Sequence, residues 1–434
     1  MTHFREPITL DLVLRSLDKV PFSKPFVVIL PILALLWERR GQSLSSALLK
    51  LPSLSEWSTL LTMRHKWVFR MVVFIVLKEL SKVCSRSASN LGVSKPDRPK
   101  WKKDVVVITG GSTGIGRDVV QHLSRKFGAR IAVLDITEPT YAPAKYGAPD
   151  ILYVRTDVTN KDEVAVAHSK IKDHFGNSPS IVVSCAGVAL AGPILTTSSR
   201  TFSRTFDINA LANVILAHEF LPYMVENNHG HFMVVASSAS YFSLPLLGPY
   251  SMSKSAALAF FETLRAELRS VYKAHRVRTS VVTPTKVRTL LGHALKDSDN
   301  NFLTPVLEPI QVASAMVDTL DSGLGRAISQ PMFTSLLPYV RALPEWFRGL
   351  LTTVGNTDSS VTAESIANSF KAGYGKNWNK DDFANVFGEM ESMVRAFAKK
   401  KKQTNKQTNT HTNMCSIERM MHNFVPVHCI MLAR

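Results

Sequence analysis

A tyrosine and a lysine four positions apart, Tyr250 and Lys254, have the clearest potential for acid–base chemistry in this sequence. Residues with this spacing at the start of a helix share one face. A phenol has a pKa of about 10 and is a poor catalyst at neutral pH, but an adjacent ammonium stabilises the phenolate and lowers that pKa. Such a pair could exchange a proton with a carbonyl or alcohol oxygen while a cofactor carries the hydride. The spacing is common, so the pair could equally lie on a solvated helix face.

A serine and an asparagine could complete a site around this pair. Ser237 lies 13 residues before Tyr250, at the end of an apolar stretch, and its hydroxyl could hold a substrate oxygen. Asn209 is expected to begin a long helix. Taken singly, both residues could be helix caps, and Asp157 and Thr289, which follow other apolar stretches, could be turn residues.

The glycine-rich segment Thr109–Gly116 (TGGSTGIG) lies between a predicted strand and a predicted helix. In that position glycines let the backbone approach a pyrophosphate, and the helix N-terminus offers free N–H groups. The spacing G-x-x-x-G-x-G therefore favours a dinucleotide site. The alternative is a tight turn that binds nothing.

An aspartate at the end of the second predicted strand, Asp135, lies 19 residues after Gly116. A carboxylate there can accept hydrogen bonds from the adenosine ribose hydroxyls and would repel a 2′-phosphate. Neither Thr113 nor Ile136 is basic, so no nearby charge would neutralise that phosphate. NAD(H) is therefore favoured over NADP(H), although Asp135 could also be a turn residue.

Short apolar stretches alternate with helical patterns from Lys103 onward. The alternation predicts βαβ units, and the lack of charge in the strands predicts burial on both faces. We expect an α/β domain of Rossmann type over 103–355, a doubly wound parallel sheet with helices on both faces. The expected strands are Val105–Ile108, Ile131–Leu134, Leu152–Val154, Ile181–Cys185, His231–Ala236, Thr279–Val282 and Arg326–Pro331. The expected helices are Ile115–Lys126, Lys161–Phe175, Ala210–Val225, Ser251–Tyr272 and Pro309–Leu320.

Two apolar runs, Phe26–Trp37 and Trp67–Leu77, precede this domain. Each is shorter than the ~20 residues that cross a bilayer. They could form a shallow hairpin in one leaflet, lie in the interface as anchors, or pack as soluble helices on the main domain or a second subunit. Tryptophans and basic residues at their ends suit a headgroup boundary, so 1–102 is predicted to associate with a membrane.

The net charge of +18 is concentrated in the flanks of the chain. Residues 1–104 hold 18 Lys and Arg against 8 Asp and Glu, and 356–434, predicted to be a polar and largely disordered tail, hold 11 against 7. No basic stripe is interleaved with aromatic residues, so nucleic-acid binding is not expected. The four cysteines form no CxxC pair, and neither a metal site nor a disulfide framework is expected.

Taken together, these motifs resemble the short-chain dehydrogenase/reductase family over about residues 103–295. Thr109, Gly110, Gly114 and Gly116 match its motif TGxxxGxG. The resemblance implies a catalytic tetrad of Asn209, Ser237, Tyr250 and Lys254, in which Asn and Lys hold a proton-carrying water chain. It also implies that Asp157 contacts adenine and Thr289 the carboxamide. The cofactor site expected from motif and resemblance comprises Thr109, Gly110, Ser112, Thr113, Gly114, Ile115, Gly116, Asp135, Asp157, Val158, Cys185, Ala186, Gly187, Asn209, Tyr250, Lys254 and Thr289.

Closer similarity, in segments such as FDINALANVILAHEFLPYMVENNHGHFMVVASSASY, is to the branch that holds retinol dehydrogenases and lipid-droplet 17β-hydroxysteroid dehydrogenases. That resemblance implies a membrane-associated enzyme of the endoplasmic reticulum or lipid droplet, with its catalytic domain facing the cytosol, that acts on lipophilic alcohols and ketones. Homodimer formation through the two long helices is also possible. Two other readings stay open: a 3-ketosphinganine reductase-like enzyme that uses NADPH, and an NAD-binding membrane scaffold without activity.

Two positions depart from the family pattern. Cys185 stands where the family has an Asn that braces the sheet beside the cofactor, and Thr285 replaces a glycine after the sixth strand. We expect the first to weaken cofactor binding and the second to alter the loop over the nicotinamide, because threonine lacks glycine's freedom at positive φ. The walls of the substrate pocket are expected to be apolar: Val188, Ala189, Leu190, Leu244, Leu246, Leu247, Leu290 and Leu291.

Overall fold

The computed structural model describes residues 9–19, 23–38, 66–93, 95–140, 151–294, 302 and 305–354, together with 361, 366, 368, 369 and 392. The chain forms two compact units, Met1–Ser94 and Lys95–Arg434. Most of the expected tail after 355 lies outside the described residues.

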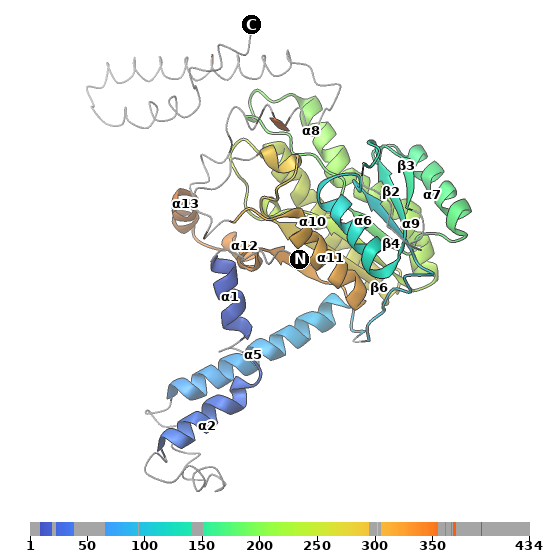
Figure 1. Ribbon diagram of the computed structural model, residues 1–434. Coiled ribbons are helices and arrows are strands. Elements are labelled where there is room, and N and C mark those ends of the chain that lie inside the picture. Colours follow the sequence, from blue (N-terminus) through green and yellow to red (C-terminus); the bar gives the residue numbers. More distant parts are fainter. Residues whose placement is uncertain are drawn as a thin grey trace, which may run out of the picture. The chain divides into compact units, whose positions relative to one another are not determined.

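A parallel sheet of seven strands forms the centre of the larger unit, in the order β3-β2-β1-β4-β5-β6-β7 (Figure 1). Every residue of β1, β4, β5 and β6 is buried. The runs of Val and Ile in β1 and β4 predict this burial, whereas β5 and β6 also bury His231 and Arg278. The order reverses direction between β1 and β4, which is the point where doubly wound sheets open a crevice at their carboxyl edge. The strands are β1 Val105–Thr109, β2 Arg130–Asp135, β3 Leu152–Arg155, β4 Ile181–Ser184, β5 Gly230–Val235, β6 Val277–Pro284 and β7 Ala327–Gln330.

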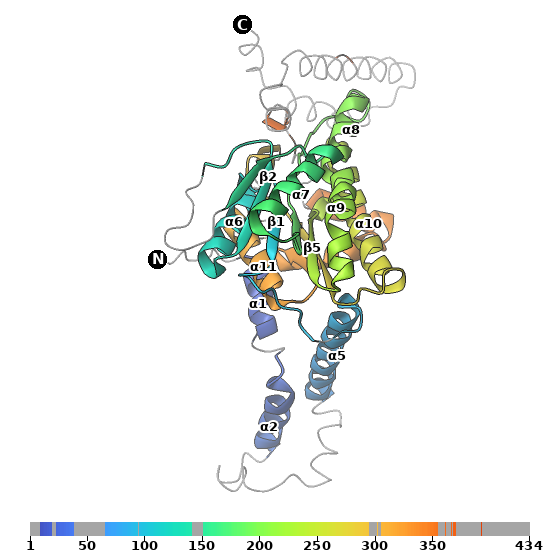
Figure 2. The ribbon, with the colours of Figure 1, turned by 90° about the vertical axis from the view of Figure 1, so that its right-hand side faces the viewer.

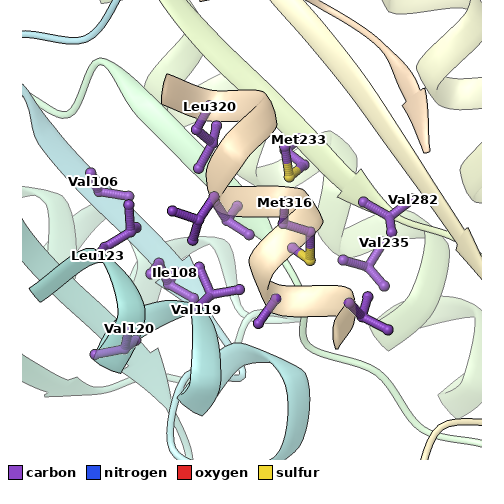
Figure 3. Packing of buried hydrophobic residues seen from close by; sticks show 14 of the residues in the cluster. Val106, Ile108, Val119, Val120, Leu123, Met233, Val235, Val282, Met316 and Leu320 are labelled. Carbon is purple, nitrogen blue, oxygen red and sulfur yellow. The ribbon is translucent and has the colours of Figure 1, made fainter. Parts of the chain in front are cut away.

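Helices cover both faces of the sheet, so the expected Rossmann-type fold is confirmed. Figure 2 shows α6 and α11 on one side, and α7, α9 and α10 on the other. On the first side Val106 and Ile108 of β1 pack against Val119 and Leu123 of α6, while Met316 of α11 joins the same core (Figure 3). These helices are α6 Gly114–Phe127, α7 Lys161–Phe175, α9 Ala212–Glu226, α10 Gly248–Ser270 and α11 Pro309–Ser322.

One helix start was predicted wrongly. Asn209 does not begin a helix: the helix starts at α8, Ser199–Phe206, where the Ser198 side chain accepts the N–H of Thr201. A π-helical turn, η1 Asp207–Leu211, then joins α8 to α9 and contains Asn209. Among the described residues, this continuous stretch 199–226 is the one helix long and apolar enough to cross a membrane, and half of its most apolar window is buried within the protein.

Several short elements were not anticipated from the sequence. Two of them, α12 Leu337–Val340 and α13 Glu345–Val354, follow the last strand. The others are the 3-10 turns η2 Ser238–Ser240, η3 Leu291–Ala294 and η4 Met332–Leu336.

The smaller unit contains three described helices, α1 Leu10–Lys19, α2 Phe26–Glu38 and α5 Lys66–Ser89. The two expected apolar runs are thus helical, and α2 packs on α5 through Ala34 and Val68. Asp18 of α1 pairs with Lys78 and Lys82 of α5. The structure leaves many of their large apolar side chains exposed: Val28, Ile29, Ile32, Leu33 and Trp37 on α2, and Trp67, Phe69, Val73, Phe74, Val76, Leu77, Leu80 and Val83 on α5.

A charged cluster holds the first residues of the larger unit at the amino-terminal edge of the sheet. His229, just before β5, contacts Asp97 through Nδ1 (2.5 Å) and Asp104 through Nε2 (3.1 Å), and Arg276 contacts Asp97 at 2.6 Å. The hydrogen bonds with Asp104 and Asp97 raise the pKa of His229 to about 9.

We expect this cluster to make stability depend on pH. Because the folded pKa of His229 lies above the ordinary 6.5, its contribution is complete below pH 6.5 and is lost as pH rises through about 9. At ~1.4 kcal/mol per pKa unit the shift corresponds to about 3.5 kcal/mol. Because His229 is partly exposed, screening by solvent reduces the expected loss to about 2–3 kcal/mol. Thermal unfolding of the full chain between pH 6 and 10 should show the decline, and His229→Gln should flatten it. The exposed His218 on α9 provides the control, because His218→Gln should leave the wild-type decline in place; equal slopes in all three proteins would contradict this role.

Candidate active site

The glycine-rich loop between β1 and α6 requires its glycines. Gly110 has φ +64°, and a Cβ there would come within 2.8 Å of the Ala186 backbone. A Cβ on Gly116 would lie 2.2 Å from the carbonyl oxygen of Gly110. The loop can therefore turn this tightly only without side chains at these two positions. Thr113, the N-cap of α6, makes no capping bond through its side chain, so its hydroxyl does not occupy the amide groups of the first turn.

The loop after β4 and the residue Thr289 both lie close to this turn. The Thr109 hydroxyl oxygen accepts the N–H groups of Cys185 and Ala186, both at 3.1 Å, which ties β1 to the loop after β4. A Cβ on Gly114 would lie 3.1 Å from the Thr289 methyl group. The structure thus brings Thr109, Gly114, Ala186 and Thr289 together at the carboxyl edge.

Two aspartates fix the loops after β2 and β3. The Asp135 carboxylate accepts the N–H groups of Ser112 and Thr137, both at 3.0 Å, which sets the side chain beside the glycine-rich loop. Asp157 accepts the Thr159 N–H at 3.0 Å and its hydroxyl at 2.7 Å, as a turn aspartate does. Val158, which follows Asp157, is buried.

The serine, tyrosine and lysine meet at the end of β5. The Ser237 hydroxyl accepts the Ala239 N–H at 3.1 Å. The Lys254 ammonium donates to the Val235 carbonyl at 2.7 Å and lies 6.0 Å from the centre of the Tyr250 ring. Burial raises the pKa of Tyr250, and its hydrogen bond with Ser237 opposes that rise. Burial also lowers the pKa of Lys254 to about 8.

Asn209 braces the loop after β4 from its π-helical turn. Its Oδ1 accepts the Val188 N–H at 2.9 Å, and its Nδ2 donates to the Val188 carbonyl at 2.8 Å and to the Ser253 hydroxyl at 2.9 Å. A Cβ on Gly187 would lie 3.1 Å from Asn209 Oδ1 and 3.4 Å from Lys254 Nζ. Asn209 and Lys254 therefore line the same glycine, and all four residues of the expected tetrad gather at one place.

The two departures from the family pattern are accommodated differently. Burial raises the pKa of the Cys185 thiol to about 11, so this side chain is neutral where the family has an amide. Thr285 does not need positive φ, and its N–H donates to the Gln330 carbonyl at 2.9 Å. Thr285 therefore adopts an ordinary backbone conformation, and the expected change in the loop over the nicotinamide stays a prediction.

An apolar cluster lies directly beside Tyr250. Leu190, Ala191 and Leu247 are fully buried in it, and Val188, Leu244, Leu246 and Tyr250 pack against it partly buried. Of the other expected wall residues, Ala189 is buried, Leu290 is exposed and Leu291 approaches Gly187. The cluster also contains Val361 and Ile366, which sequence reasoning missed because they lie in the stretch expected to be a polar tail.

The arrangement suits a dinucleotide better than a metal. Among the residues that the structure describes, no group of three or more His, Cys, Asp or Glu side chains could hold a metal ion. A turn free of side chains at a helix N-terminus fits a pyrophosphate, and a carboxylate at the end of β2 fits a ribose.

Comparisons with known proteins agree with this geometry. A family model described as short chain dehydrogenase matches residues 104–300, which include β1 to β6 and the whole expected tetrad. Dehydrogenase RED2 of Cochliobolus heterostrophus is 35% identical over 211 residues, covering 49% of this chain and 78% of that protein. Human estradiol 17-beta-dehydrogenase 11 is 30% identical over 261 residues, covering 58% and 85%. Human 17-beta-hydroxysteroid dehydrogenase 13 is 29% identical over 258 residues, covering 58% and 83%.

Proposed function

The chain belongs to the short chain dehydrogenase family, and we propose that it uses NAD(H) to interconvert an alcohol and its carbonyl on a lipophilic substrate such as a retinoid, steroid or long-chain lipid. Membership of this family shows that the chain is an oxidoreductase that acts on alcohols or carbonyls. The observation that carries the finer proposal is the convergence of Tyr250, Ser237 and Lys254 beside an apolar cluster.

The residues divide the proton chemistry between them. In the oxidising direction the alcohol O–H bond breaks and its proton passes to the Tyr250 oxygen, while Ser237 holds the same substrate oxygen by a hydrogen bond. The Lys254 ammonium stabilises the phenolate against the burial that disfavours it, and Asn209 and Lys254 lead the proton away through water. When bound, the nicotinamide supplies the acceptor of the carbinol hydride.

Loops at the carboxyl edge of the sheet would hold the cofactor. The turn Thr109–Gly116 would bind its pyrophosphate, and Asp135 would bind its adenosine ribose. Asp157 and Val158 would contact the adenine, Cys185–Gly187 would line the cofactor site, and Thr289 would contact the carboxamide.

Removing the charge of Asp135 should weaken the preference for NAD. Asp135→Asn keeps an oxygen acceptor for only one of the Ser112 and Thr137 amides, which bond to different oxygens of the carboxylate, and it removes the repulsion of a 2′-phosphate. We expect the ratio of kcat/KM with NAD to kcat/KM with NADP to fall about tenfold, which corresponds to ~1.4 kcal/mol. Asp173→Asn, on the exposed face of α7, is the matched control. If both variants keep the wild-type ratio, Asp135 does not determine the choice between NAD and NADP.

A lipophilic substrate is supported by the apolar surroundings of Tyr250 and by two relatives named as steroid dehydrogenases. Membrane association is supported by the apolar side chains that α2 and α5 expose. We propose that α2 and α5 attach the enzyme to the endoplasmic reticulum or lipid droplet, with the catalytic unit facing the cytosol.

A screen of retinols, steroids and long-chain alcohols with both cofactors, on full-length protein in lipid vesicles, tests the proposal. We expect turnover of at least one lipophilic alcohol, faster with NAD than with NADP. Faster turnover with NADPH on a keto-lipid would instead favour the 3-ketosphinganine reductase-like reading.

A further inference from the structure

Two apolar residues far beyond the family match, Val361 and Ile366, lie in the cluster beside Tyr250. We propose that they form an outer wall of the substrate site and limit the size of the lipophilic group that reaches Tyr250. The proposal rests on the proposed function and adds specificity-determining residues to it. The family match ends at residue 300, so this wall is supplied by the chain's own C-terminal part.

The burial of these two side chains is nearly complete. Val361 is 3% exposed and Ile366 is 0% exposed. Burying an aliphatic side chain contributes about 1.5–3 kcal/mol, so Val361 and Ile366 are each held firmly against their partners. The partners are the buried Leu190, Ala191 and Leu247, together with the partly buried Val188, Leu244, Leu246 and Tyr250.

Hydrogen bonds of Ser369 join Ile366 to the loop after β4. The Ser369 hydroxyl oxygen accepts the Ala191 N–H at 3.2 Å and donates to the Ile366 carbonyl at 2.7 Å. Ser369 is 2% exposed, so the Ala191 amide would otherwise be left without this acceptor in a buried place. The position of Ile366 is therefore specified by hydrogen bonds as well as by packing.

Val361 and Ile366 pack on residues of the loops after β4 and β5, and the second of these loops connects Ser237 to the helix that contains Tyr250. Gly192 pairs with Leu247, and its N–H donates to the Leu246 carbonyl at 2.7 Å, so the loops after β4 and β5 form one platform. Tyr250 comes three residues after Leu247 in the chain. A side chain buried against the platform therefore bounds the space in which the apolar part of an alcohol can lie.

The test is the selectivity for substrate size. Each methylene that fits or fails to fit an apolar pocket changes kcat/KM about 10- to 200-fold. Ile366→Ala and Val361→Ala should shift the optimum of a homologous series of secondary alcohols toward longer or bulkier members by about tenfold in relative kcat/KM, chiefly through KM. Ile366→Phe should shift it toward smaller members. Val317→Ala, at a fully buried site on α11, is the control, because it should lower the Tm without moving the optimum.

Each outcome decides the matter. If the variants at 361 and 366 lower the Tm as Val317→Ala does but leave the size optimum in place, the wall does not exist. If an alanine variant fails to fold, Ile366→Val and Ser369→Ala provide the same comparison with smaller losses. If wild type turns over no alcohol, the proposed function has failed; the wall is then tested by whether alcohols of graded size raise the Tm of wild type and of Ile366→Ala with different size optima.

Discussion

Tyr250→Phe should lower kcat for alcohol oxidation by about 10²- to 10⁴-fold, the range expected when a positioned acid–base group is removed. Phenylalanine keeps the ring that packs against the apolar cluster, so the fold and the substrate contacts remain. Only the oxygen that exchanges the proton and bonds with Ser237 is lost. Initial rates at saturating NAD, together with the Tm, measure the effect.

Tyr241 offers the matched control for this substitution. It lies in the loop between Ser237 and Tyr250, and burial raises its pKa as well. Tyr241→Phe should therefore keep the wild-type rate within about twofold, since no step of the proposed chemistry uses it. Equal activity in the two variants would contradict the role given to Tyr250.

Gly116→Ala should weaken cofactor binding. The added Cβ would lie 2.2 Å from the carbonyl oxygen of Gly110, a backbone atom that can move only if the turn opens. Overpacking of this kind costs about 1–3 kcal/mol or more, and each ~1.4 kcal/mol lost from binding raises Kd tenfold. We expect the Kd for NAD, measured by calorimetry, to rise at least tenfold and the Tm to fall by several degrees.

Gly349 in α13 allows the same change where it should be harmless. A Cβ there meets no atom within 4 Å, and alanine is favoured over glycine inside a helix by ~1 kcal/mol. Gly349→Ala should thus leave the Kd unchanged and keep or slightly raise the Tm. If Gly116→Ala binds NAD as tightly as Gly349→Ala does, the turn is not the pyrophosphate site.

The sheet and its helices could be predicted from the sequence because local pattern and burial agree there. Runs such as Val105–Ile108 have no charge and are buried on both faces, so each strand was recognisable by itself. The π-helical turn around Asn209 could not be anticipated, because its wider hydrogen-bond spacing has no residue signature. The helix was expected to start at Asn209, whereas the structure begins it at Ser199.

The catalytic and cofactor-binding residues could be predicted from the sequence, but two of the apolar residues beside them could not. Tyr250, Lys254 and the glycine-rich turn follow from spacing, since each lies within one strand–loop–helix unit. Val361 and Ile366 are single apolar residues in a polar stretch, so composition placed them in a tail. Their role depends on contacts with Leu190 and Leu247, more than a hundred residues earlier, and nothing local in the sequence encodes such contacts.

Transfer of deuterium from a carbinol carbon to NAD tests the central claim most directly. Full-length protein in vesicles would be incubated with NAD and lipophilic alcohols deuterated at the carbinol carbon, and the reduced cofactor analysed by mass spectrometry. The account predicts one deuterium atom in NADH for each carbonyl formed, and labelling that is at least about a hundredfold slower when Tyr250→Phe replaces wild type. Binding of NAD without labelled NADH from any alcohol in the panel would contradict it and would favour a cofactor-binding membrane scaffold without activity.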